Sequence, residues 1–487
     1  MERLIEIIYK PDLATWSDDN KRAFSELFGS GGGRYSTRAE TAVKLRAPQF
    51  SGSGSVPFGA YIHPSNPDSG AYGGMSFVIF PVEDAPCLVG LVIGTQGLSP
   101  DEEILGRPGH GRKVSAICAW LNHTYGNGRL IAWSKHDPVR TDLDAPINIR
   151  RHFSAYDSVF KRYGKVLYGI FAPTGDQSIT SNAVKAFLDL MFAERGHFPL
   201  SRFTPEAEKI QSDYLSHLMP DVDQADVTQL LQQRRYVILE GPPGTGKTRL
   251  ARKLLHETYQ GNGFTVQFHP NTTYENFVGG LAPVETADGF GFRFAPYKGA
   301  LMQAVESSAH SSQPYLLHID EINRADLAKI LGEAIFLLEP DADDDRQTKL
   351  AYDFGLPFGD SLSLPPNLHI LGTMNSSDRS IAIIDIAIRR RFAFRKMWPQ
   401  LAVVRAMACD LMVGAFTNLL AIFVEHATED AFDLVPGHSY FLMSDEEAGI
   451  QALKTSVRPL LEEYLAQGFV AGFAEPIRAY LQWIDSL

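Results

Sequence analysis

The sequence predicts an α/β fold: a core in which a parallel sheet is flanked by helices, a small helical domain after it, and a mixed α+β domain before it. Three observations support this. Residues 236–255 suggest a buried strand, a glycine-rich turn and a helix. Residues 314–321 form an apolar run that ends in two carboxylates, and residues 367–375 form another that ends in an asparagine. Strands that alternate with helices are typical of parallel sheets, so we expect these strands to share one sheet.

Length and composition fit a globular protein of several domains. The chain has 487 residues, of which 44% are hydrophobic and 21% charged, enough for about three domains with their own cores. No apolar run approaches the ~20 residues that span a bilayer, and the N-terminus lacks the apolar core of a signal peptide. The scattered Cys87, Cys118 and Cys409 suggest neither a disulfide framework nor a zinc site. We therefore expect a cytoplasmic protein without membrane contact.

The N-terminal 200 residues predict a mixed α+β domain. Short β-branched and aromatic runs at 58–62, 75–80, 88–93 and 166–171 indicate strands. Helices are expected at 114–121 and 182–192, with a linker around 195–205. The glycine run at 29–33 has no strand before it and no Lys-Thr after it, so we interpret it as a loop.

A basic segment in this domain has two interpretations. Residues 107–165 hold eleven Lys and Arg against four acids, with seven large aromatic residues between them. Cations on phosphates and rings that stack on bases would suit nucleic acid. Alternatively, the rings are core and the charges form a solvated face, which is the usual case for scattered charges. The aromatic residues are Trp120, Tyr125, Trp133, Phe153, Tyr156, Phe160 and Tyr163.

The glycine-rich turn has the pattern G-x-x-x-x-G-K-T. It consists of Gly241, Pro242, Pro243, Gly244, Thr245, Gly246, Lys247 and Thr248. Glycines let successive backbone N–H groups face one anion, and the helix that follows adds its positive end. Lys247 supplies a point charge for the β- and γ-phosphates, and the Thr248 hydroxyl can ligate Mg²⁺. A chance glycine turn would lack the flanking strand and helix, so we predict that the chain binds a nucleoside triphosphate, GTP or ATP.

Three polar side chains at strand ends extend this site to hydrolysis. Asp320 can hold Mg²⁺, and Glu321 can orient and deprotonate the attacking water. Asn375 can hydrogen-bond the γ-phosphate or that water. We also expect a second buried strand at 265–269, a helix over 324–338 and a solvated acidic turn at 339–346, which lacks the ligand spacing of a calcium loop.

Residues 225–470 resemble the AAA+ superfamily and, more narrowly, the McrB-type motor subunits of modification-dependent restriction systems. The resemblance does not extend to the first 200 residues. Ser376-Ser377 stand where that family usually has Thr-Ala, a conservative departure. The matching stretches are 266–269 with 274–277, Ile319-Asp320-Glu321-Ile322-Asn323-Arg324 with 329–333, Gly372-Thr373-Met374-Asn375-Ser376-Ser377-Asp378-Arg379-Ser380, Arg389-Arg390-Arg391-Phe392, Gly437-His438-Ser439-Tyr440-Phe441 and 459–465.

The resemblance implies an architecture and partners. It predicts a target-recognition domain over residues 1–200, an AAA+ large subdomain over 205–397 and a small helical lid over 398–487. It implies a ring, expected to be a hexamer, and a separate McrC-like nuclease partner in defence against foreign, modified DNA that the N-terminal domain recognises. No nuclease motif is seen in this chain. Arg389, Arg390 and Arg391 lie 14 to 16 residues past Asn375, where oligomeric ATPases place an arginine that reaches a neighbour's γ-phosphate, although they could also form a solvated helix cap.

A second functional class remains open. A MoxR-like AAA+ chaperone would share the core, but its N-terminal domain would bind a protein client. The product of the neighbouring gene discriminates between the two hypotheses. A McrC-like nuclease would indicate the restriction motor, and a metal-binding adhesion-type protein would indicate the chaperone.

Overall fold

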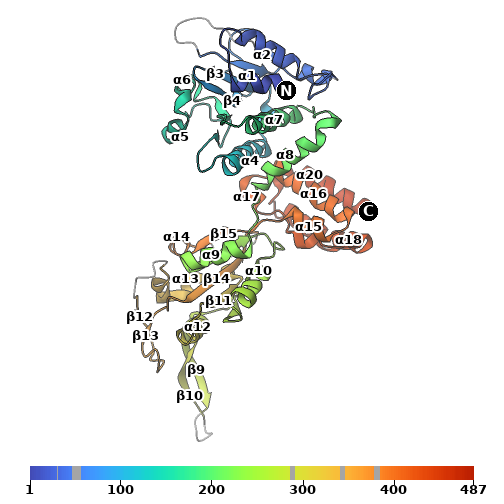
Figure 1. The fold of residues 1–487 in the computed structure, drawn as a ribbon. Coiled ribbons are helices and arrows are strands. Elements are labelled where there is room, and N and C mark those ends of the chain that lie inside the picture. Colours follow the sequence, from blue (N-terminus) through green and yellow to red (C-terminus); the bar gives the residue numbers. More distant parts are fainter. Residues whose placement is uncertain (30, 47–55, 286–290, 340–345, 378–383) are drawn as a thin grey trace. The chain divides into compact units, whose positions relative to one another are not determined.

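The computed structural model describes residues 1–29, 31–46, 56–285, 291–339, 346–377 and 384–487 (Figure 1). Most of the predicted acidic turn at 339–346, together with Asp378, Arg379 and Ser380 of the McrB-like stretch, lies outside these residues. The chain divides into two compact units. The N-terminal unit comprises Met1–Leu218 and Phe423–Thr428, and the C-terminal unit comprises Met219–Ile422 and Glu429–Leu487.

The N-terminal unit is built on a six-stranded antiparallel sheet in the order β1-β2-β3-β4-β6-β5. Its inner strands are almost fully buried because helices cover both faces, which explains their continuous apolar runs. The strands are β1 (Lys44–Arg46), β2 (Gly59–Ile62), β3 (Met75–Val82), β4 (Ala85–Ile93), β5 (Ala132–Ser134) and β6 (Leu167–Phe171). The predicted strands are confirmed, as is the mixed α+β class.

The helices of this unit form two cores on opposite faces of the sheet. One face is covered by α1 (Glu2–Tyr9), α2 (Trp16–Ser25), α4 (Pro108–Tyr125), α7 (Gln177–Glu194) and α8 (Thr204–Ser216). The other is covered by α5 (Ile147–His152) and α6 (Asp157–Tyr163), and the short α3 (Glu102–Leu105) precedes α4. Because α8 packs into the first core, this unit continues through the segment expected to be a linker and ends at Leu218.

The C-terminal unit contains a five-stranded sheet in the order β15-β7-β14-β11-β8, with every neighbouring pair parallel. The strands are β7 (Tyr236–Gly241), β8 (Gly263–Gln267), β11 (Tyr315–Asp320), β14 (Leu368–Asn375) and β15 (Ala393–Lys396). The three central strands are buried, as predicted. The expectation of a second buried strand is wrong in one respect: β8 is the edge strand, so it is only half-buried.

Helices flank both faces of this sheet. One face carries α9 (Gln224–Arg234) and α10 (Lys247–Lys253), which continues as a π-helical segment at Leu254–Thr258. The other carries α11 (Tyr274–Phe277), α12 (Ala300–Ala309) and α13 (Leu327–Leu331). The continuous helix predicted over 324–338 is wrong. The turn Ile322–Arg324 precedes α13, and Gly332, with φ +50°, ends it before the turn Gly332–Leu337.

Two hairpins interrupt the alternation of strands and helices. The ribbon of β9 (Gly279–Glu285) and β10 (Phe292–Lys298) extends away from the sheet (Figure 1), and β12 (Thr348–Lys349) pairs with β13 (Ser361–Leu362). After α14 (Ile386–Arg389) and β15 the chain is helical, as expected: α15 (Leu401–Met407), α16 (Asp410–His426), α17 (Glu429–Phe432), α18 (Glu446–Ala452), α19 (Arg458–Ala466) and α20 (Ala474–Ser486). Within the described ranges, none of the helices is both long and apolar enough to cross a membrane.

Candidate nucleotide-hydrolysis site

The loop between β7 and α10 has the backbone that phosphate binding requires. Gly244 and Gly246 have φ of +82° and +85°, a left-handed conformation that costs a residue with a Cβ free energy. The buried Thr245 closes the loop, since its hydroxyl donates to the Pro242 carbonyl at 3.0 Å. Gly241 lies so close to β15 that a Cβ there would stand 2.2 Å from the Met397 carbonyl oxygen. The backbone therefore forms a tight, glycine-dependent loop at the carboxyl end of β7.

Lys247 lies inside this loop. Its side chain is 6% exposed, and Nζ donates to the carbonyls of Gly241 at 2.9 Å and of Pro242 at 2.7 Å. Burial lowers the pKa of Lys247 to about 8, although the nearby charges of Glu321 and Asp320 act in the opposite direction. An ammonium held only by neutral carbonyls gains a stronger, charge-assisted partner when a phosphate arrives.

Asp320 lies beside two hydroxyl groups at the same edge of the sheet. Oδ1 accepts from Thr248 Oγ1 at 3.0 Å and also from Thr373 Oγ1. Thr248 follows the loop lysine, and Thr373 belongs to β14, which pairs directly with β11. The predicted pair, Asp320 and Thr248, is thus brought together. Thr373 was not predicted, although its position two residues before Asn375 places both on one face of the strand.

Glu321 and Asn375 are in direct contact. Asn375 Nδ2 donates to Glu321 Oε1 at 2.7 Å, because the parallel β11 and β14 end at the same edge. On the other side of the carboxylate, Arg324 Nε lies 3.2 Å from Oε2. Glu321 itself has φ +54°, an uncommon conformation for a residue other than glycine and one that often marks functional sites.

The three arginines have different surroundings. Arg391 is buried: Nη1 donates to the Ala387 carbonyl at 2.7 Å, and Nη2 lies 3.3 Å from Glu339 Oε1. Arg389 and Arg390 are exposed. The guanidinium of Arg389 stacks over the Phe394 ring, and that of Arg390 lies 3.8 Å from Glu339 Oε1. Arg391 thus holds the end of α14 in place, whereas the other two are open to the surface.

A turn of the C-terminal helical part touches the phosphate loop through main-chain atoms. The Gly437 N–H donates to the Pro243 carbonyl at 3.1 Å, and the Ser439 N–H donates to the Gly244 carbonyl at 3.0 Å. A Cβ on Gly437 would stand 2.2 Å from the Gly244 carbonyl carbon. The sequence singled out this Gly-His-Ser-Tyr segment as part of the lid, but nothing in it indicated that the loop is its neighbour.

In the basic segment of the N-terminal unit, residues 107–165, the aromatic rings belong to the core, which was the second of the two interpretations. Trp120, Phe153, Tyr156 and Phe160 are buried, and the other three rings pack partly buried against the two cores. These rings are therefore not a stacking surface for bases. Most of the charges have internal partners: Arg107 and Lys113 with Glu194, Arg112 with main-chain carbonyls, Lys135 with three carbonyls, Arg140 with Asp142, Arg150 with Asp144, and Lys161 with Asp157.

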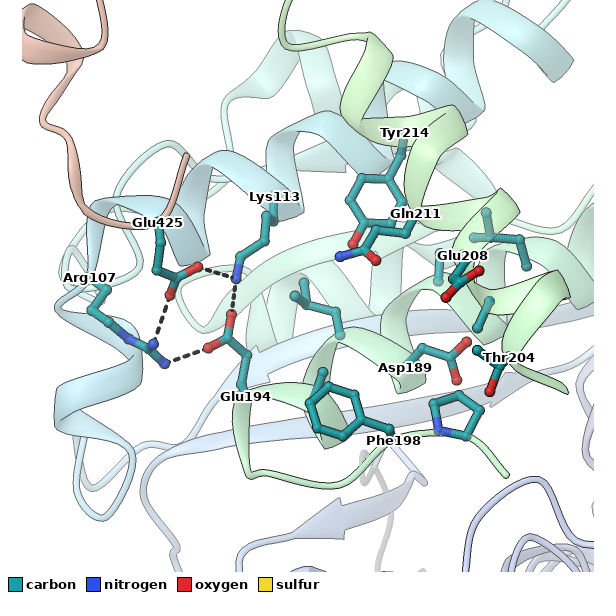
Figure 2. Close-up of a pocket in the computed structure, with 16 residues that line it drawn as sticks. Arg107, Lys113, Asp189, Glu194, Phe198, Thr204, Glu208, Gln211, Tyr214 and Glu425 are labelled. Carbon is teal, nitrogen blue, oxygen red and sulfur yellow. Dashed lines mark hydrogen bonds and ion pairs between the residues drawn. The ribbon is translucent and has the colours of Figure 1, made fainter. Parts of the chain in front are cut away.

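A cavity of about 500 Å³ in this unit is lined by residues of α4, α7 and α8 (Figure 2). Figure 2 shows a ring of ion pairs at its edge, in which Arg107 and Lys113 each contact both Glu194 and Glu425 at 2.5–2.7 Å. Burial would raise the pKa of Glu194, but the neighbouring His110 and Lys113 lower it to about 2. The four charges of this ring therefore neutralise one another.

Comparison with known proteins places this geometry in a family. Residues 236–392 match the AAA domain of the dynein-related subfamily. The type IV methyl-directed restriction enzyme EcoKMcrB subunit of Escherichia coli K12 is 28% identical over 361 residues, 68% of this chain and 77% of the relative. The type II restriction enzyme BsuMI component YdiS of Bacillus subtilis 168 is 26% identical over 198 residues, 32% of this chain and 55% of the relative.

A solved structure of an ATPase from Cytophaga hutchinsonii covers 50% of this chain at 13% identity with a TM-score of 0.25, a likeness too weak to bear on the fold. The AAA match spans the strands that carry the phosphate loop, Asp320, Glu321 and Asn375, and it ends just after the three arginines. Residues 236–392 thus form an AAA domain, and the chain is similar to the McrB subunit of a restriction enzyme over 68% of its length.

Proposed function

We propose that this chain is the motor of a restriction system: it hydrolyses GTP or ATP in a ring and drives a separate McrC-like nuclease against foreign, modified DNA. The proposal is supported by the two curated relatives, both described as parts of restriction enzymes. The observation that carries the hydrolytic part is the 2.7 Å contact between Asn375 and Glu321, beside a phosphate loop that contains a buried lysine.

The residues divide the chemistry among them. The amides of the Gly241–Thr248 loop and Lys247 bind the phosphates. The Thr248 hydroxyl and the Asp320 carboxylate are oxygen ligands of the kind Mg²⁺ prefers, so they fit a nucleotide-bound Mg²⁺, which would neutralise phosphate charge. Glu321 orients the attacking water and accepts its proton while the oxygen bonds to the γ-phosphorus and the bond to the diphosphate breaks. Asn375 holds Glu321 and donates to the γ-phosphate or the water.

In a ring, Arg389 or Arg390 would complete the site of the neighbouring subunit. An exposed guanidinium can neutralise charge on a transferred phosphoryl group, whereas Arg391 is committed to its own subunit. A mixing experiment tests this: Glu321→Gln and the double variant Arg389→Ala/Arg390→Ala are each expected to lack turnover alone. Mixed, they regain part of it, because some sites pair an intact Glu321 with an intact arginine. No recovery in mixed rings would contradict the shared site.

The N-terminal unit is proposed to recognise the DNA target. The rings are buried or partly buried and so are not available to stack on bases. Contacts with DNA phosphates would come from the exposed side chains Arg129, Arg151, Arg162 and Lys165. Binding of the full-length chain to methylated and unmethylated duplexes, measured at two salt concentrations, tests this. A DNA-binding role predicts an affinity that falls steeply with salt. Absence of binding to either duplex at low salt would contradict it.

The overall proposal is tested by hydrolysis of GTP and ATP, measured side by side with and without the product of the neighbouring gene. We expect turnover of at least one nucleotide, stimulated by a nuclease partner. A chain that turned over neither nucleotide in any combination would not be a motor.

A further inference from the structure

The turn Ile322–Arg324, which follows the catalytic carboxylates, takes no part in the mechanism above. Glu321, with φ +54° and ψ +46°, reverses the chain at the end of β11, and the turn is closed by the Arg324 N–H, which donates to the Glu321 carbonyl at 2.9 Å. Such a conformation costs about 1 kcal/mol or more for a residue with a Cβ. The reversal brings the side chains of Asn323 and Arg324 back to the edge of the sheet where hydrolysis is proposed to occur.

Arg324 contacts the proposed base. Its Nε lies 3.2 Å from Glu321 Oε2, while Asn375 Nδ2 lies 2.7 Å from Oε1. Rotation about the last bond of a glutamate side chain is otherwise broad, with no sharp preferred angle. Donors on both oxygens fix that rotation. A base that must direct a lone pair at a water within about 3 Å depends on such an orientation.

Asn323 acts on the other partner. It is 4% exposed, and its Nδ2 lies 3.4 Å from the main-chain carbonyl oxygen of Asn375. Its Oδ1 is buried without a hydrogen-bond partner among the residues that the structure describes. Leaving a buried acceptor unpaired costs about 1–3 kcal/mol, which is no less than the ~1 kcal/mol that the one hydrogen bond from Nδ2 contributes. The amide of Asn323 is therefore better explained by a role in positioning the end of β14 than by a contribution to the stability of the fold.

We propose that Arg324 and Asn323 are positioning residues, which hold Glu321 and Asn375 in the orientation that hydrolysis requires. The inference rests on the proposed hydrolytic function and deepens it. Packing does not account for the Arg324 contact: the Arg324 side chain is 45% exposed, and exposed pairs of this kind contribute about 0–1 kcal/mol to stability. Its removal should spare the fold and impair turnover.

The test compares Arg324→Met with Arg324→Lys in the full-length chain. A control is Arg478→Met, which removes an exposed pair with Glu475 of the same i,i+3 spacing from α20, away from the site. GTP and ATP turnover gives kcat and KM, and thermal unfolding gives stability. For Arg324→Met we expect kcat to fall at least ~10-fold, since misplacing a catalytic group by 1 Å can cost ~100-fold. KM and melting temperature should stay near those of the parent, Arg324→Lys should recover part of kcat, and Arg478→Met should match the parent.

Three results would overturn the inference: unchanged or higher kcat in Arg324→Met, a loss confined to KM, or no recovery in Arg324→Lys. Its failure is distinct from failure of the proposed function. If the parent turns over nucleotide and Glu321→Gln does not, the hydrolytic site stands whatever Arg324→Met shows. If the parent itself shows no turnover under any condition, the proposed function fails and takes the role of Arg324 with it.

Discussion

The contact between the phosphate loop and Gly437 makes a demanding prediction about nucleotide binding. A Cβ at this position would stand 2.2 Å from the Gly244 carbonyl carbon and 2.3 Å from the Pro243 oxygen, both main-chain atoms that cannot rotate away. Gly437 has φ −64° and ψ 154°, which alanine adopts readily, so Gly437→Ala changes the contact without straining the local backbone. The turn and the loop must separate by about 1 Å to admit the methyl group.

The cost follows from the interactions that are lost. Separation breaks the hydrogen bonds from Gly437 N–H and Ser439 N–H, each contributing about 1 kcal/mol. Inserting a methyl group into a packed contact adds about 1–3 kcal/mol. The total of about 3–5 kcal/mol corresponds to a shift of at least ~100-fold between the joined and separated states.

Titration calorimetry with GTP and ATP measures the effect on the loop. Because the same loop residues are proposed to bind phosphate through their N–H groups and accept hydrogen bonds from the turn through their carbonyls, we expect nucleotide affinity to fall at least ~10-fold in Gly437→Ala. Gly472→Ala is the matched control, since a Cβ there meets no atom within 4 Å. Parental affinity in Gly437→Ala, or an equal loss in Gly472→Ala, would refute the reasoning.

Three further predictions concern stability and charge. Burial lowers the pKa of both His318 and His369 to about 4. The C-terminal unit should therefore lose stability as the pH falls from 6.5 toward 4, by about 2 kcal/mol per histidine at pH 5. Urea unfolding at pH 7 and pH 5 measures this loss, and equal free energies of unfolding at the two pH values would contradict it. Arg391→Ala should destabilise this unit by about 1–3 kcal/mol because it breaks the hydrogen bond to the Ala387 carbonyl at the end of α14 and removes one of the cations beside Glu339, whereas Arg390→Ala should leave the melting temperature unchanged. Equal melting temperatures in the two variants would contradict the structural role of Arg391. Glu425→Gln should destabilise the N-terminal unit by about 1–3 kcal/mol, because Lys113, whose side chain is 12% exposed, loses one of its two carboxylate partners. Glu26→Gln removes an exposed ion pair and should cost under ~0.5 kcal/mol. Urea titration measures both free energies of unfolding, and equal effects would show that burial of the pair does not matter.

The central strands and the phosphate loop were predictable because several signals agreed there. Apolar runs, glycine positions and polar strand ends all indicated one parallel sheet, so Asp320, Glu321 and Asn375 met where expected. Signals were weaker at the periphery. The half-buried β15 at Ala393–Lys396 has no apolar run, and the β9–β10 ribbon exposes Phe292 and Phe294, which a pattern of buried strands does not anticipate.

Other features depended on geometry that sequence patterns do not encode. The helix expected over 324–338 is divided because Gly332 adopts a positive φ. Interleaved cations and rings in residues 107–165 gave no sign of which side chains face the core, and the rings proved to be buried or partly buried. The contact between Arg324 and Glu321 depends on the left-handed backbone conformation of Glu321. The sequence motif shows that both residues are present, but it does not show that their side chains touch.

The claim that this chain is a hydrolytic motor is tested most directly by comparing the parent with Glu321→Gln. GTP and ATP binding and turnover would be measured for both proteins, with and without the neighbouring gene product. We predict that Glu321→Gln binds nucleotide as tightly as the parent and loses at least ~100-fold in turnover, because the amide cannot accept the proton of the attacking water. Equal turnover in the two proteins would contradict the assignment of Glu321 and the hydrolytic site built around it.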